Sequence, residues 1–118
     1  MKRTILLGLF LCIGITLSAQ NKNAKATIEV DGVCLMCKDR IEKASIKTKG
    51  VKSAVWNVET HKLSLIYDER KTDLNKIQEG IAAVGHDTNE IIATDEAYDS
   101  VHPCCKYRSD DVKDDHGN

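Results

Sequence analysis

A strand, a glycine, two cysteines and a helix follow one another over a short stretch, and this order constrains the fold more than any other feature of the chain. Apolar and polar residues alternate over residues 26–31, as in a half-buried strand, and Gly32 follows. A helical pattern of apolar residues then runs over residues 36–49. Cys34 and Cys37 are therefore expected on the loop between a strand and a helix.

Two thiols three residues apart on such a loop can close on one metal ion. Cys37 is expected to face the positive end of the helix dipole, which favours the thiolate, the form that binds metal. Soft sulfur ligands select Cu(I), Zn(II) and similar ions over Mg(II) or Ca(II). A thioredoxin-like redox pair, half of a zinc knuckle and a small disulfide share this spacing, so the pair alone leaves these alternatives open.

The remaining patterns predict a small α+β domain. Further strands are expected over residues 51–58, 62–67 and 88–93. A second helix is expected to begin near Thr72 or Asp73, either of which can cap it, and to end at Gly85. With the first strand and helix, this gives the ferredoxin-like βαββαβ sandwich, in which two helices lie on one face of a four-stranded antiparallel sheet. No repeat and no second domain is expected.

A set of residues in and beyond the cysteine stretch follows a known family pattern. They are Ile28, Val30, Gly32, Cys34, Cys37, Ile41, Glu42 and Ala44, then Gly50-Val51, Tyr67-Asp68 and Ala83-Val84-Gly85-His86-Asp87. On these residues the chain resembles the heavy-metal-associated domain of copper chaperones, copper-ATPase N-terminal modules and the periplasmic mercury-binding protein. It departs from that pattern at Val33, where the family has Met, and at Leu35-Met36, where the family has small residues.

The resemblance covers about residues 25–93, and the domain is expected over residues 26–94. It implies the ferredoxin-like fold and a soft-metal site at Cys34 and Cys37. It also implies that the ion is sequestered or passed to a partner by stepwise thiolate exchange. No substrate bond would be made or broken, so no enzymatic activity is expected.

The start of the chain has the features of a signal peptide, expected over residues 1–19. Lys2 and Arg3 precede an apolar run, and small residues indicate cleavage after Ala19. The apolar run is too short to span a bilayer comfortably, so no membrane span is expected in the mature chain. The protein is therefore expected in the bacterial periplasm or cell envelope, with residues 20–25 as a flexible leader.

Composition narrows the classes of function. The 118-residue chain has a net charge of −1 and only 4% aromatic residues, which argues against nucleic-acid binding, since that function needs a basic surface with aromatic side chains. Of five cysteines, Cys12 leaves with the signal peptide. The other four, in an exported chain, also fit two disulfides. A disulfide-stapled interaction domain and a thiol-disulfide exchange protein therefore stay open as alternatives.

Residues 95–118 form an acidic tail that holds two of the cysteines. A short helical turn is expected over residues 95–100. Residues 109–118 contain four aspartates and are expected to be disordered.

The adjacent cysteines of the tail, Cys104 and Cys105, cannot easily bond to each other, because the ring that would form strains the disulfide. Two arrangements stay open. In one, the tail folds back so that these thiols, with His102, add ligands to Cys34 and Cys37. In the other, the tail thiols form disulfides with that pair.

Other residues near the motifs are weaker candidates for metal ligands. His86 follows the second helix, and the resemblance places this position near the metal loop, so His86 is a further candidate ligand. His61 lies in a hairpin turn that is expected at the opposite end of the sheet, and so at the surface. Lys38 and Glu42 are expected to be solvated, and Met36 is expected to pack rather than bind metal.

These patterns together predict an exported protein that binds a soft metal through Cys34 and Cys37. Cu(I) is the favoured ion, and Hg(II) and Zn(II) are the alternatives. The expected partner is an envelope protein that donates or accepts the ion, such as a component of an efflux or transport complex.

Overall fold

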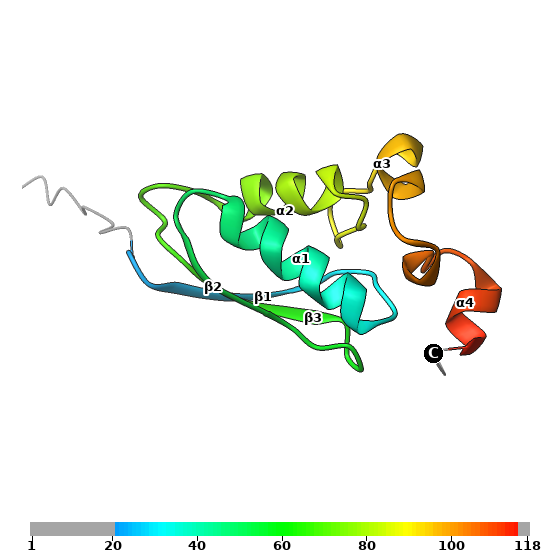
Figure 1. Ribbon diagram of the computed structural model, residues 1–118. Coiled ribbons are helices and arrows are strands. Elements are labelled where there is room, and N and C mark those ends of the chain that lie inside the picture. The colour runs from blue at the N-terminus through cyan, green and yellow to red at the C-terminus, as the bar shows by residue number, and fades with distance from the viewer. Residues whose placement is uncertain (1–20, 116–118) are drawn as a thin grey trace, which may run out of the picture.

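The computed structural model describes residues 21–115, so the predicted signal peptide lies outside the described residues. The elements of the domain are β1 (Ala24–Glu29), α1 (Leu35–Lys47), β2 (Val51–Trp56), β3 (Lys62–Tyr67) and α2 (Leu74–Ala83). The strands form one antiparallel sheet in the order β1-β3-β2, and both helices cover the same face of it (Figure 1). Among the described helices, none is long and apolar enough to cross a bilayer.

The core lies between the sheet and the two helices, and the alternation of apolar residues accounts for it. Along β3, Leu63 and Leu65 are buried while Ser64 between them is exposed. β1 starts at Ala24, inside the segment expected to be a leader, because Ala24 is buried and pairs with Tyr67. The helices add their own buried residues to the core, namely Cys37, Ile41, Ile77 and Ile81.

The predicted fourth strand over residues 88–93 is only a single bridge. Thr88 pairs with Val30 at the free edge of β1, where a fourth strand would lie. Beyond it, the Thr88 hydroxyl donates to the carbonyl of Ile91 and accepts from its N–H, and the Asp87 carboxylate accepts from the N–H of Ala93. Because these side chains take the backbone partners that a neighbouring strand would supply, the chain turns instead of extending.

The hairpin turn with His61 lies at the same end of the sheet as the cysteine loop, so the expectation that it lies at the opposite end is wrong. The carbonyl of His61 accepts from the N–H of Val30 at 2.9 Å. Its imidazole stacks on the indole of Trp56 with ring centroids 5.6 Å apart. α1 returns the chain to the far end of the sheet before β2 begins, so β2 ends where β1 ended.

The tail is more ordered than predicted. The helical turn expected over 95–100 is α3 (Asp95–Asp99), followed by a 3-10 turn, η1 (Pro103–Cys105). The segment expected to be disordered contains α4 (Asp110–Asp115), whose first turn carries aspartates that suit the helix dipole. Figure 1 shows the tail gathered at the end of the domain where α1 begins.

Candidate metal centre

Close packing fixes the path of the chain into the cysteine loop. A Cβ on Gly32 would lie 3.0 Å from the ring of Trp56 and 3.0 Å from the Cβ of Cys37, so a larger residue would push the loop off β2. The indole Nε1 of Trp56 donates to the carbonyl of Val30 at 2.9 Å. The loop therefore leaves β1 along a path set by one buried aromatic ring.

The first turns of α1 are tied to β2 by residues that were expected to be solvated. The Glu42 carboxylate accepts from the N–H of Trp56 at 2.8 Å and pairs with the ammonium of Lys38. That ammonium also donates to the carbonyl of Trp56 at 2.9 Å. Both side chains are only part-exposed, so they hold the start of the helix, and with it Cys37, in place.

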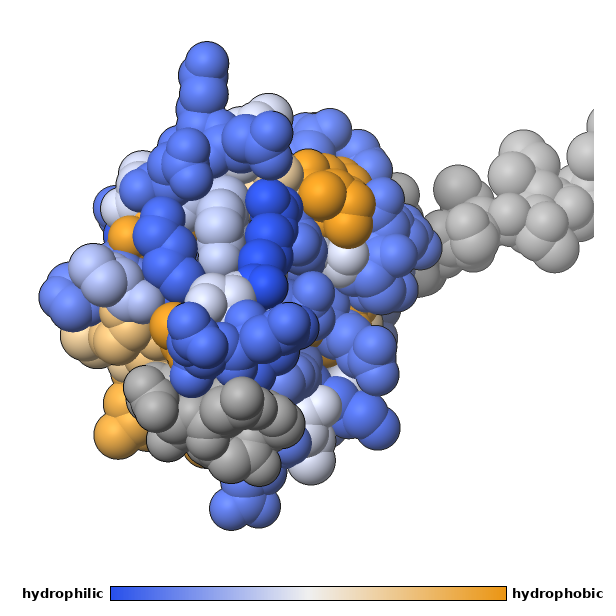
Figure 2. Space-filling view, turned by 90° about the vertical axis from the view of Figure 1, so that its right-hand side faces the viewer, coloured by the Kyte–Doolittle hydropathy of each residue, from blue (hydrophilic) through white to orange (hydrophobic). Residues whose placement is uncertain are grey.

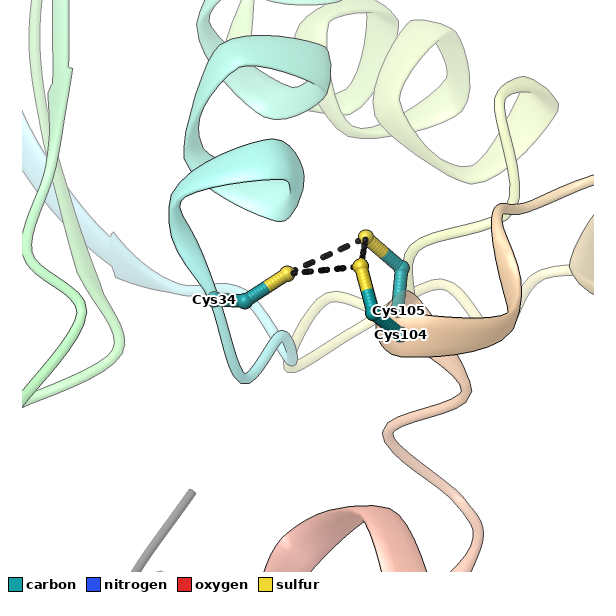
Figure 3. A group of neighbouring side chains, drawn as sticks. All are labelled: Cys34, Cys104 and Cys105. Carbon is teal, nitrogen blue, oxygen red and sulfur yellow. Dashed lines mark hydrogen bonds between the residues drawn. The ribbon is translucent and has the colours of Figure 1, made fainter. Parts of the chain in front are cut away.

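Four cysteine sulfurs gather at the start of α1. The Sγ of Cys34 lies 3.4 Å from that of Cys37, 3.6 Å from that of Cys104 and 3.3 Å from that of Cys105. The Sγ atoms of Cys104 and Cys105 are 3.9 Å apart. Figure 3 shows both tail thiols pointing from η1 toward Cys34. None of the four described cysteines forms a disulfide, so the tail folds back with its thiols unpaired.

A thioether stands beside this cluster. The thiol of Cys104 donates to the Sδ of Met36 at 3.3 Å. Met36 was expected only to pack, and it is in fact 49% exposed on the first turn of α1. The structure thus places a fifth sulfur next to the four thiols.

The four thiols differ in acidity. Burial works to raise the pKa of Cys34, but hydrogen bonds from the backbone of Cys37 and from the neighbouring thiols outweigh it and lower that pKa. Burial is the largest cause that raises the pKa of Cys37, Cys104 and Cys105. Cys34 at the helix N-cap, and not Cys37 as expected, is therefore the thiol that ionises first, because Cys37 is fully buried.

The two candidate histidines have different places. His102 is exposed, and its Nδ1 accepts from the N–H of Cys104 at 3.2 Å, so it caps η1. His86 is fully buried, its Nδ1–H donates to the carbonyl of Asp31 at 2.8 Å, and its ring stacks on Tyr107. Burial lowers the pKa of His86. Within the described part of the chain, no hydrogen bond joins His86 to a cysteine sulfur.

An open groove lies beside the sulfur cluster, along the outer side of α1. Its volume is about 570 Å³, and its lining includes Met36, Arg40, His102 and Cys105. Leu35, in the first turn of the helix, is 71% exposed at its edge. The groove is therefore an open surface feature beside the sulfur cluster.

Sequence reasoning missed the residues that hold the tail in place. Tyr107 is 3% exposed, although it follows the cysteines in a polar segment. Arg108 pairs with Asp87 at 2.7 Å across the fold. The only sequence signal was an aromatic and a basic residue, Tyr107 and Arg108, shortly after the cysteine pair. Such a signal does not show which residues these side chains contact.

Comparison with known proteins identifies relatives of the part that carries Cys34 and Cys37. The pattern of the heavy-metal-associated domain matches residues 27–87. The CopZ metallochaperone is 30% identical with a TM-score of 0.53, and the match covers 55% of this chain and 98% of that chain. A search of curated proteins found no match.

Two other solved structures are similar to this chain. The N-terminal domain of a potential copper-translocating P-type ATPase from Bacillus subtilis, in the Cu(I)-loaded state, is 25% identical over 56% of this chain and 84% of that chain, with a TM-score of 0.53. The water-soluble region of the P-type ATPase CopA from Bacillus subtilis is 30% identical over 58% of this chain and 46% of that chain, also with a TM-score of 0.53. The matched part is the ferredoxin-like domain and not the whole chain.

Proposed function

This chain belongs to the heavy-metal-associated domain family, and from that membership we propose that it binds one Cu(I) ion through Cys34 and Cys37. The observation that carries the proposal is the 3.4 Å separation of these two sulfurs at the start of α1. The lowered pKa of Cys34 supplies a thiolate for the first metal–sulfur bond. The packing of Gly32 against Trp56 holds the loop ready for the second.

The choice of Cu(I) rests on the donor atoms and on the relatives. Thiolate and thioether sulfur favour soft ions, and Cu(I) is among the softest that proteins handle. One similar structure is a metallochaperone and another is Cu(I)-loaded, which supports copper for this chain as well. Zn(II) and Hg(II) are the competing ions, because both also bind thiolates.

We further propose that the protein works in the cell envelope, where it sequesters the ion or exchanges it with an envelope protein. The support for export is the signal-peptide pattern of residues 1–19. An oxidising compartment turns unprotected thiol pairs into disulfides. A bound ion would keep Cys34 and Cys37 reduced there, so metal occupancy and thiol protection go together.

The proposal is tested by anaerobic titration of the reduced mature chain, residues 20–118, with Cu(I) against a coloured chelator. We expect one tightly held ion, and we expect the C34S/C37S variant to lose more than about a hundredfold in affinity, because both expected ligands are gone. L35A is the matched control, since Leu35 is exposed on the same turn and carries no sulfur. Unchanged affinity in C34S/C37S would refute the proposal.

A thiol-disulfide exchange protein is the second candidate, and the unequal acidity of the thiols favours it. Cys34 has a lowered pKa and lies within 3.6 Å of three other sulfurs, so a disulfide could pass between them. A measured reduction potential separates the two functions. A protein that binds Cu(I) needs no particular disulfide potential, whereas an exchange protein must hold one near that of its compartment.

A further inference from the structure

The sulfur cluster has the dimensions of a closed metal site. Four sulfurs placed around one ion at bond lengths of about 2.3 Å stand about 3.8 Å from one another, whereas two on opposite sides stand about 4.6 Å apart. The Sγ of Cys34 lies 3.3 to 3.6 Å from the Sγ atoms of Cys104 and Cys105, which are 3.9 Å apart. The Sγ atoms of Cys34, Cys104 and Cys105 all lie within 4.8 Å of one another, so these thiols match three ligands around one ion better than a linear pair.

The tail that brings two of these sulfurs is anchored by contacts that involve no thiol. The Tyr107 hydroxyl donates to the carbonyl of Gly85 at 2.7 Å and accepts from the N–H of Asp87 at 2.9 Å. Its ring stacks on His86 and meets Tyr98 edge-on, with centroids 5.3 and 5.1 Å apart. Tyr107 thus fixes the chain two residues after the cysteine pair.

A paired charge adds a second anchor next to the first. The guanidinium of Arg108 donates to both carboxylate oxygens of Asp87 and to the carbonyl of Ala93. It also lies 4.3 Å from the ring centre of Tyr98. These contacts join the tail to the same turn that replaces the fourth strand.

The third anchor lies on the other side of the cysteine pair. Val101 is 3% exposed and packs on Gly85. A Cβ added to Gly85 would lie 2.6 Å from the Cγ1 of Val101. Arg40 of α1 donates to the carbonyl of Val84 and to the hydroxyl of Ser100. The segment that carries the two thiols is therefore held at both ends before any metal binds.

We propose that Cys104 and Cys105 are additional ligands of the same ion, so that the tail closes a site of three or four thiolates over it. This inference rests on the proposed function of Cys34 and Cys37 and deepens it. Because the anchors set the tail thiols in place beforehand, little conformational entropy is lost when they bind. Cys37 and Cys105 are buried whereas Cys34 and Cys104 are part-exposed, so the ion would be partly enclosed by the protein. Figure 2 shows this end of the molecule as mostly hydrophilic surface with separate hydrophobic patches.

A closed site of this kind retains its ion. Two thiolates on an open loop leave room for the thiol of a partner, whereas four occupied positions must lose a ligand first. The tail therefore acts as a lid that slows release, and the protein serves sequestration unless a partner displaces the tail thiols.

The test counts sulfur atoms around the ion by X-ray absorption of the Cu(I)-loaded mature chain. We expect three or four sulfurs per ion in the wild type and two in C104S/C105S, with release to a chelator about tenfold or more faster in that variant. Two sulfurs in the wild type and unchanged release in C104S/C105S would overturn the inference while leaving Cys34 and Cys37 as ligands. Tight binding by C34S/C37S would instead overturn the proposed function.

Two further measurements test the closed site independently of the sulfur count. Y107F keeps every sulfur but removes the hydroxyl that anchors the tail, so we expect an unchanged sulfur count and faster release; release at the wild-type rate would refute the lid. The mass of protein prepared without reductant shows whether two disulfides form, since they would lower it by about 4 units. A chain with that deficit that takes up no Cu(I) even after reduction would overturn the closed site.

Discussion

Adding one methyl group at Gly85 should weaken the packing of the tail on the domain. It ends α2 with φ of +101°, a left-handed conformation that costs a residue with a Cβ about 1 to 2 kcal/mol. A Cβ there would also lie 2.5 Å from the carbonyl oxygen of Ala97 and 2.6 Å from the Cγ1 of Val101. Overpacking of this kind costs about 1 to 3 kcal/mol. We therefore expect G85A to lower the free energy of unfolding by about 2 to 5 kcal/mol.

G80A is the matched control for this substitution. Gly80 lies inside α2 with no positive φ, and a Cβ there would meet the Thr48 hydroxyl at 3.1 Å. Helix propensity favours alanine by about 1 kcal/mol, so the variant should be neutral or stabilised if that hydroxyl shifts slightly. The same change at two nearby glycines should thus act in opposite directions.

The assay is urea unfolding of the reduced, metal-free chain, followed by circular dichroism, with hydrogen exchange to localise the effect. In G85A we expect a lower midpoint and faster amide exchange in residues 101–108, because the clash falls on α3 and its neighbours. A G85A variant as stable as the wild type, or equally protected in the tail, would show that the tail does not pack as described and would remove the basis of the lid.

The remaining predictions concern charge, protonation and metal. Burial lowers the pKa of His86 in the folded state, so stability should be full above the ordinary histidine pKa of about 6.5 and fall as the pH drops below it; H86Q should flatten that fall in urea midpoints measured between pH 7.5 and 5.5. D87N should cost about 1 to 2 kcal/mol, since it leaves Arg108 without its charge partner in a part-buried place; R108Q/D87N, measured by the same unfolding assay, should recover part of the loss. Cu(I) at 100 times its dissociation constant should stabilise the wild type by about 2.7 kcal/mol, and an equal shift in C34S/C37S would contradict the assigned ligands.

Local patterns predicted most of the domain, because its strands and helices follow from residues close in sequence. Alternation located the strands. Thr72 or Asp73 was expected to cap the second helix, and it is Asp73 whose carboxylate accepts from the N–H of Lys76 at 2.8 Å. The strand–loop–helix setting of Cys34 and Cys37 follows from the same patterns. The predicted fourth strand did not form in full, because its polar side chains hydrogen-bond to nearby backbone groups. The alternation of apolar and polar residues does not reveal such bonds.

The errors at the site have a different origin, since each depends on burial or on contacts distant in sequence. The dipole argument favoured Cys37, but full burial outweighs the dipole there and leaves Cys34 as the more acidic thiol. The place of the His61 turn depends on the path of α1 and not on the turn itself. The tail left two arrangements open, and its fold-back rests on Tyr107 and Arg108, whose partners lie about 20 residues away.

The different burial of the four thiols suggests the order in which they would release the ion to a partner. Cys34 and Cys104 are part-exposed, whereas Cys37 and Cys105 are buried. In the proposed site, a thiol from a partner would therefore reach Cys34 and Cys104 before the buried pair, and the thioether of Met36 lies beside Cys104. The buried pair would release last, because the anchors at Tyr107 and Arg108 must loosen before Cys105 can leave. In this order the speed of transfer depends on the anchors of the tail, while the choice of ion depends on the sulfurs, and substitutions in the two sets should change these properties separately.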